Sequence, residues 1–324
     1  MNDQQMREIA RWYEWFSVHE AKGHSSLWAD ITAQVALDSE ILEFLSDLPQ
    51  PKRQPNLFLA SYRSLFGTPA DWSTFRAQLL AEPTKVADRM RERSTQTNEP
   101  GRCAVLLPVL ARLRQPLALI EVGASAGLCL LPDFYAYDYG QGELLPHGQK
   151  APPLFKCAAS ANTPIPEKMP NIVWRAGLDL NPLDVCNAEE MAWLETLVWP
   201  GQEERLARLR KSSAIAQQQL PRVVQGNLSD DLETLLNDVP IGLTTVVFHS
   251  AVLNYLGTQK KRDDFERLVT ATADHWISNE SPKVLPQLAA KAPAQSKDGF
   301  LLSLDGRPVA WTDPHGAWLD WIEG

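Results

Sequence analysis

The densest group of chemically capable residues lies at Leu117–Leu128, where an apolar run ends in an acid and a glycine-rich turn follows. Gly123 would let the chain turn sharply, and Gly127 would permit close packing between a strand and the helix expected after it. The free N–H groups at the start of that helix can meet a polar cofactor. Glu121 would accept hydrogen bonds from the ammonium side of such a cofactor. The alternative is a tight strand-to-helix turn without a ligand.

This turn resembles motif I of S-adenosylmethionine-dependent methyltransferases, in which an acid is followed by three glycines at alternate positions. Ser125 stands where the middle glycine of that motif would be, while Gly123 and Gly127 match the other two. The nicotinamide fingerprint fits less well, because Ser125 replaces its second glycine and Leu128 its third. The resemblance implies S-adenosylmethionine as cofactor, held by Glu121, Gly123, Ser125 and Gly127.

A second acid is expected at the end of the next strand, where it would hold the ribose hydroxyls of the cofactor. Asp179 lies at such a position, and Asn181 can assist it. Asp179 follows the turn by about 50 residues, whereas roughly 20 is usual, so we predict an insertion over residues 139–170. Asp138 is the competing acid, but it leaves little room for both a helix and a strand. An ordinary helix-capping role is the alternative for Asp179.

Three further positions follow later strands. Gly226 and Asn227 stand where adenine contacts are usual in such folds, although Asn227 is also a good N-cap for residues 228–236. His249 ends the fourth strand, where ligands bind in open α/β sheets, so it is a candidate base. A structural hydrogen-bonding role is its alternative. Asn254 and Tyr255 follow it as candidate substrate contacts.

The elements that must position these residues alternate between strand and helix from Leu117 onward. Short apolar runs predict five parallel strands, at Leu117–Val122, Ile172–Gly177, Arg222–Gln225, Thr244–His249 and His275–Ser278. Asp305-Gly306 then predicts a tight antiparallel hairpin. The pattern favours an α/β fold with a Rossmann-like, methyltransferase-type doubly wound sheet and a C-terminal antiparallel hairpin. A dinucleotide-binding domain would more often end in a sixth parallel strand.

The first part of the chain predicts helices without strands. Apolar residues recur at helical spacing, and Asp38, Asn56 and Asp71 are placed to cap successive helices. We therefore expect a helical N-terminal subdomain over residues 1–94 and the α/β domain over residues 95–324.

Composition excludes several classes of protein. The net charge of −9 argues against a protein that tracks nucleic-acid phosphates. Four dispersed cysteines form no C-x-x-C pair, so neither a zinc site nor a disulfide framework is indicated. The N-terminus is polar, and no apolar run reaches the roughly 18 residues of a membrane span. We expect a cytoplasmic protein without a membrane association; nothing in the sequence indicates its oligomeric state.

Four stretches together resemble the DUF2332 family of bacterial proteins, and the resemblance spans nearly the whole chain. They are Gln96–Arg102, Glu121–Leu128, Gly177–Pro182 and Trp199–Arg205. The resemblance implies a methyltransferase-like fold but no particular reaction.

That resemblance draws attention to the polar segment Gln96–Arg102, which precedes the first strand. Arg102 can pair with the carboxylate of the methionine end of a cofactor. Glu99 is a candidate catalytic residue, and Gln96 and Asn98 are candidate substrate contacts. The alternative is a buried polar network that ties the helical region to the sheet. The remaining candidate substrate contacts, of the same kind, are Glu280 and His315.

These observations favour an S-adenosylmethionine-dependent methyltransferase. Methyl transfer needs little more than an oriented nucleophile, so a missing catalytic signature does not count against it. The acidic composition makes a small-molecule acceptor more plausible than nucleic acid. A non-catalytic binding or regulatory protein with the same fold is the first alternative, and a nicotinamide-linked oxidoreductase is the second.

Overall fold

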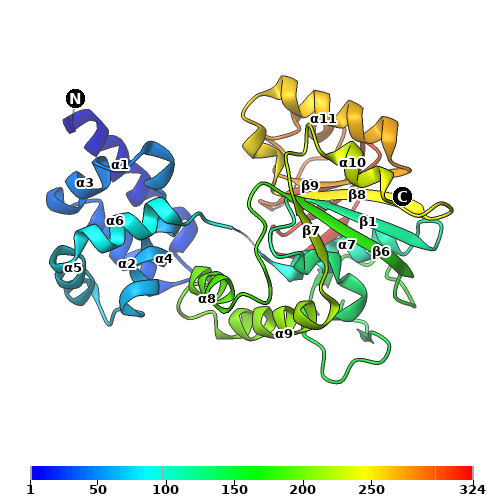
Figure 1. Ribbon diagram of the computed structural model, residues 1–324, viewed down its shortest axis with the longest axis horizontal. Coiled ribbons are helices and arrows are strands. Elements are labelled where there is room, and N and C mark those ends of the chain that lie inside the picture. Colours follow the sequence, from blue (N-terminus) through cyan, green and yellow to red (C-terminus); the bar gives the residue numbers. More distant parts are fainter. Residues whose placement is uncertain (1, 97, 296, 323–324) are drawn as a thin grey trace. The chain divides into compact units, whose positions relative to one another are not determined.

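The computed structural model describes residues 2–96, 98–295 and 297–322 (Figure 1). The chain forms two compact units. Unit 1 comprises Met1–Thr97 and Ala188–Ala207, and unit 2 comprises Asn98–Asn187 and Arg208–Gly324. A later segment, Ala188–Ala207, thus joins the N-terminal helices in unit 1.

Unit 1 is built from helices around one apolar core. Tyr13, Trp28, Phe58 and Phe75 are almost completely buried in it. As predicted, the side chains of Asp38 and Asp71 cap helices by accepting backbone N–H groups. The helices are α1 (Asn2–Phe16), α2 (Ser26–Val35), α3 (Ser39–Ser46), α4 (Pro55–Phe66), α5 (Trp72–Ala81), α6 (Pro83–Glu92) and α8 (Ala188–Leu197), with a π-helical turn at Ser17–Ala21.

Two details of unit 1 differ from the sequence prediction. Asn56 does not cap α4, because Pro55 already begins this helix and the Asn56 amide oxygen instead accepts the Trp199 indole N–H at 3.0 Å. Trp193 of α8 lies in the same core and donates its N–H to the Ser94 carbonyl at 3.0 Å. These two tryptophans explain why residues 188–207 belong to unit 1 rather than to the α/β unit.

Unit 2 contains a nine-stranded sheet of order β5-β12-β11-β10-β9-β8-β1-β6-β7. Neighbouring strands from β7 to β9 are all parallel, and β9, β10, β11 and β12 follow one another antiparallel. The strands are β1 (Leu117–Val122), β5 (Ala158–Ala159), β6 (Ile172–Asp179), β7 (Arg222–Gln225), β8 (Thr244–Ser250), β9 (His275–Glu280), β10 (Phe300–Leu304), β11 (Arg307–Thr312) and β12 (Trp318–Trp321).

The sequence predicted the five parallel strands and the hairpin, and the structure confirms each of them. It adds β12 and the short β5 at the sheet edge, and a separate sheet of order β3-β2-β4 within the first crossover. That sheet is formed by β2 (Ala136–Asp138), β3 (Glu143–Leu144) and β4 (Leu154–Lys156). Asp138 therefore lies outside the large sheet, while Asp179 ends β6, the parallel strand that pairs with β1 and was predicted as the second parallel strand.

Helices cover both faces of the large sheet (Figure 1). α10 (Leu232–Asn237) and α11 (Gln259–Thr272) pack on one face, in a core that includes Ile120, Val122 and Val247. The short, fully buried α7 (Cys103–Leu110) lies on the other face (Figure 1). Because successive strand side chains point to opposite faces, Glu121 faces the α7 side and His249 faces the α11 side.

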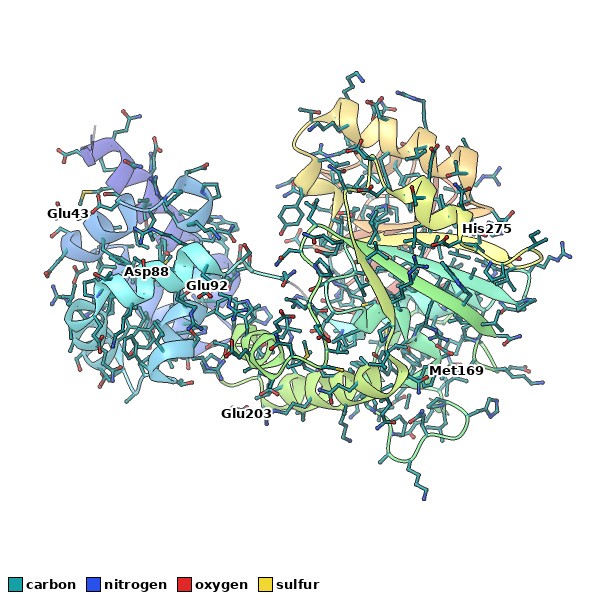
Figure 2. All side chains as sticks on the ribbon, viewed as in Figure 1. Glu43, Asp88, Glu92, Met169, Glu203 and His275 are labelled. Atoms are coloured by element: carbon teal, nitrogen blue, oxygen red, sulfur yellow. The ribbon has the colours of Figure 1, made fainter. Side chains whose placement is uncertain are left out.

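The remaining helices complete the crossovers and the surface. α9 (Glu203–Gln219) precedes β7, and the one-turn α12 (Pro286–Ala289) follows β9. Within the described residues, no helix is long and apolar enough to cross a membrane. Figure 2 shows acidic side chains such as Glu43, Asp88 and Glu92 on the exposed surface of unit 1, in keeping with the net charge of −9.

Candidate functional site

The glycine turn after β1 is tightly packed. A Cβ at Gly123, whose φ is 74°, would collide with Cγ2 of Val252, from the connection that follows β8. A Cβ at Gly127 would lie 3.0 Å from Val223. Ser125 has φ of 51°, a left-handed conformation that costs energy for a residue with a side chain. The glycines therefore allow neighbouring segments to approach closely, with local strain at Ser125.

The helix expected after the turn does not form, and this prediction was wrong. Leu128–Leu130 and Pro132–Phe134 are single 3-10 turns. Pro132 lacks the N–H that would bond the Leu128 carbonyl in a helix, and the Tyr135 hydroxyl donates to that carbonyl at 2.7 Å instead. An anion site built from a helix start is therefore missing here.

The backbone N–H groups of the turn are also occupied. Those of Gly123 and Ala124 bond the Leu178 carbonyl, and that of Gly127 bonds Ala124. The Ala126 N–H donates to Oδ1 of Asn98 at 3.0 Å, and Nδ2 of Asn98 donates to the Ser125 hydroxyl at 2.5 Å. Asn98, a predicted substrate contact, thus fills the position that a ligand acceptor group would take.

Asp179 is committed to the same turn. Its Oδ2 accepts the Ser125 N–H at 2.8 Å, and its Oδ1 accepts the Asn181 N–H at 2.8 Å. The acid therefore fixes both the glycine turn and the start of the connection after β6. Asn181 is exposed, and the ribose role of both residues stays a prediction.

Glu121 is the unusual member of the site. Its side chain is 7% exposed, and among the residues that the structure describes its Oε2 has no hydrogen-bond partner. Burial raises the pKa of this carboxyl well above its ordinary value, and nearby Cys129 and Asp179 act in the same direction, while the Arg102 guanidinium opposes them. A buried carboxyl oxygen without a partner is costly unless something else supplies the missing bond.

Arg102 joins this carboxyl to the ends of later strands. The buried guanidinium donates from Nη1 to the Ser250 carbonyl at 3.0 Å and from Nε to the Pro314 carbonyl at 2.9 Å. Beside it, the Asn279 amide donates to the Ser250 hydroxyl at 3.2 Å and accepts from Thr312 at 2.8 Å. We name Arg102, Glu121, Ser250, Asn279 and Thr312 the Glu121 cluster.

Sequence reasoning missed three members of this cluster. Ser250 and Thr312 end β8 and β11, and Asn279 is the penultimate residue of β9. Their signal was their position, because polar side chains near the carboxyl ends of parallel strands face the usual ligand crevice, and β8, β9 and β11 all end at this edge of the sheet. Asn279 escaped notice because the predicted fifth strand ended at Ser278, two residues before the observed end of β9 at Glu280.

Glu99 lies next to the cluster and is buried, with 4% of its side chain exposed. Its Oε1 accepts the Gly101 N–H at 3.0 Å, and its carbonyl accepts the Cys129 thiol at 3.5 Å. The neighbouring Cys103 side chain is the largest cause that raises the pKa of the Cys129 thiol, and burial acts in the same direction. Glu99 thus shapes the entry to α7, and its catalytic role stays a prediction.

His249 and Glu280 form a second buried group, on the α11 side of the same sheet edge. The indole N–H of Trp276 donates to His249 Nε2 at 3.0 Å, so the ring proton sits on Nδ1 and is donated to Glu280 Oε1 at 2.8 Å. The same oxygen accepts the N–H groups of Val252 at 2.8 Å and Leu253 at 3.1 Å. We name these residues the Glu280 group. A base role for His249 would require the Trp276 bond to break first.

The other predicted residues lie outside these two groups. Gly226 and Asn227 form a closed turn, in which the Asn227 N–H donates to Asp231 at 2.7 Å and its side chain accepts the Ser229 N–H at 2.8 Å. Asn254, Tyr255 and His315 are exposed, Tyr255 by 78%. Gln96 belongs to unit 1, and its place relative to the sheet is not defined.

Comparison with known proteins gives a family but little else. The model of a family described as an uncharacterised protein conserved in bacteria (DUF2332) matches residues 10–321. No curated protein matches the chain. One similar solved structure, described as a possible exported protein from Bordetella parapertussis, is 11% identical, with 86% of this chain and 71% of that chain covered and a TM-score of 0.30.

Proposed function

The chain belongs to the bacterial DUF2332 family, and we propose that it is an S-adenosylmethionine-dependent methyltransferase with a small-molecule acceptor. The observation that carries the proposal is the unpartnered Oε2 of Glu121. It lies at the end of β1, between β6 and β8, where the strand order reverses and open α/β sheets bind their ligands. The ammonium group of a methionine-type cofactor would supply the missing bond.

The neighbouring residues suit the rest of such a cofactor. Arg102 is a buried cation beside Glu121, as the carboxylate next to that ammonium requires. Oδ1 of Asn98 already bonds the Ala126 N–H, which a ligand acceptor group would take over. The parallel order from β7 to β9 with an antiparallel strand beside β9 resembles the methyltransferase strand plan.

Access to this site requires a local movement. Val252 packs against Gly123 and, with Asn98, covers the turn. The covering segment begins at Ala251, with φ of 59°, and reaches Gly257, with φ of 72°. Two positive φ values frame a segment whose backbone conformation is costly at Ala251, so an open form of residues 251–257 is within reach.

A non-catalytic binding protein is the second candidate, and the same packing favours it. The N–H groups of residues 123–127 all have hydrogen-bond partners, and both carboxylate oxygens of Asp179 accept backbone N–H groups. A turn whose hydrogen bonds are complete without a cofactor is expected of a protein that keeps the methyltransferase fold but does not bind the cofactor.

The test is calorimetric titration of the full chain with S-adenosylmethionine and S-adenosylhomocysteine, with NAD as control. Because burial raises the pKa of Glu121, capture of an ammonium by its carboxylate should be accompanied by proton release at pH values below the raised pKa. Titrations in two buffers of different ionisation enthalpy measure that proton. Glu121→Gln should weaken binding by about tenfold or more and abolish the release.

Asp179 needs a conservative change in the same experiment. Asp179→Ala would free the Ser125 N–H and disorder the turn, so lost binding would have two explanations. Asp179→Asn keeps an acceptor for the turn and removes the charge. Absence of binding by S-adenosylmethionine and S-adenosylhomocysteine at millimolar concentration would reject the methyltransferase proposal in favour of the non-catalytic one.

A further inference from the structure

A pocket of about 280 Å³ lies beside the glycine turn, apart from the Glu121 cluster. It is lined by Ala126 of the turn, by residues 182–185 after β6, and by Leu220, Pro221 and Val223 around the start of β7. None of the residues of the Glu121 cluster lines it. All of the lining residues belong to unit 2.

The pocket exists because the first crossover lacks an α-helix on this face. Parallel strands are usually joined by a helix that covers the sheet, but residues 123–171, all of them described, hold 3-10 turns and short strands instead. Gly177 and Val223 are paired across β6 and β7 on this face. The Val223 side chain contributes to the wall.

Its side chains are mostly apolar, but polar atoms, among them the Asp184 carboxylate, make up a comparable share of the exposed lining. Apart from Asp184, the lining side chains are aliphatic or proline. Asp184 is exposed and accepts the Cys186 N–H at 2.8 Å, which fixes its carboxylate at the rim. Such a lining suits an uncharged ring that carries a polar edge, and it disfavours an anion.

The rim is strained on one side. Leu220 has φ of 47° and leaves 61% of its apolar side chain exposed. A left-handed leucine with an exposed side chain is unfavourable both sterically and in hydration. A ligand that covers this side chain would recover the hydration part of that cost, and strain of this kind gathers at ligand sites.

We propose that this pocket binds a small, uncharged aromatic molecule. At the roughly 30 Å³ that one liquid water occupies, 280 Å³ accommodates about nine non-hydrogen atoms. That is the size of a fused bicyclic ring such as indole, and it is too small for a cofactor such as S-adenosylmethionine. The site is therefore independent of the proposed methyltransferase activity.

The experiment is a two-dimensional amide NMR titration of the full chain with indole and with indole-3-carboxylate. Indole should give saturable shifts at Ala126, Asp184, Val185 and Val223. Indole-3-carboxylate should bind about fivefold more weakly, since its charge lies near Asp184. Asp184→Asn should narrow that difference.

Two variants decide whether the pocket itself binds the ring. Leu220→Ser removes the exposed rim side chain and should weaken indole binding about tenfold. Ile241→Ser is the matched control, because Ile241 is fully exposed in the same unit and does not line the pocket. Saturable shifts at the lining amides that only Leu220→Ser weakens would support the proposal. Shifts elsewhere, no saturation up to millimolar indole, or equal effects of both variants would overturn it.

Discussion

Two buried carboxyl groups lie at the same edge of the sheet and differ in how completely they are bonded. On the α11 side, Oε1 of Glu280 accepts three N–H groups, from His249, Val252 and Leu253. On the α7 side, Oε2 of Glu121 has no partner within the described part of the chain. The two side chains are equally hidden from solvent, at 2% and 7% exposed.

This difference is what we expect between a structural carboxylate and a ligand-binding carboxyl. The Glu280 group fixes the backbone at the start of the segment that covers the glycine turn, so its hydrogen bonds stabilise the folded state. The Glu121 cluster carries an unmet hydrogen bond, which proteins retain where a ligand completes it. Stability and binding should therefore respond in opposite ways to changes at the two glutamates.

The largest effect is expected at Glu280. Glu280→Ala would leave the His249, Val252 and Leu253 N–H groups without their acceptor, and should lower the free energy of unfolding by about 4 kcal/mol. Urea unfolding measures this loss. Glu280→Gln, which keeps an acceptor oxygen, should lose much less. Equal losses for the two variants would show that the hydrogen bonds do not hold this group together.

At neutral and alkaline pH, Glu121→Gln should raise the free energy of unfolding rather than lower it. Burial raises the pKa of Glu121 in the folded chain, so between its ordinary value and the raised one the unfolded chain ionises while the folded chain stays neutral. Parent stability falls through that window by up to about 1.4 kcal/mol per pH unit. The variant lacks this loss and should become relatively more stable as pH rises, in unfolding curves taken from pH 4 to pH 8.

A constant difference between parent and variant across that pH range would show that Glu121 titrates alike in the folded and unfolded chain. The contrast with Glu280 would then lose its electrostatic basis. The unpartnered oxygen of Glu121 would remain, but it would no longer distinguish a ligand-binding carboxyl from a structural one.

Much of the α/β fold was readable from local patterns. Continuous apolar runs marked β1 and β8, and Asp305-Gly306 marked the hairpin, because burial and turn chemistry act over a few residues. The division into units was harder, since Trp193 and Trp199 join the N-terminal core across about a hundred residues of chain. No local sequence pattern in residues 188–207 indicates that they pack with the N-terminal helices.

The site was only partly readable for the same reason. Glu121 and Asp179 were marked by their strand ends, but a sequence does not show which hydrogen bonds are already satisfied. The packing of Val252 on Gly123 depends on two loops distant in the chain. Pro132, which prevents the helix, was visible in the sequence, and its spacing from Leu128 was the overlooked signal.

Asp179 offers a sharper test of the turn. Asp179→Ala removes the acceptor for the Ser125 and Asn181 N–H groups and should cost about 2 kcal/mol, whereas Asp179→Asn should cost about half of that. Amide hydrogen exchange at Ser125 should accelerate in the alanine variant and change little in the asparagine variant. Unchanged exchange in both would mean that the turn is held by Asn98 rather than by Asp179.

The smallest expected effect on stability belongs to Val252, where the two regions meet. Its N–H is held by Glu280, and its side chain covers Gly123 beside the Glu121 cluster. Val252→Ala should cost about 1 kcal/mol of stability and strengthen S-adenosylhomocysteine binding several-fold, because less side chain must leave the turn. Val269→Ala on α11 is the matched control, since this buried valine belongs to the core against which Val252 also packs, whereas Val252 is the residue nearest to Gly123. Stronger binding in Val252→Ala alone would establish that the covering segment restricts access to the site. Equal binding in both variants would show that Val252 packs on Gly123 without limiting ligand access.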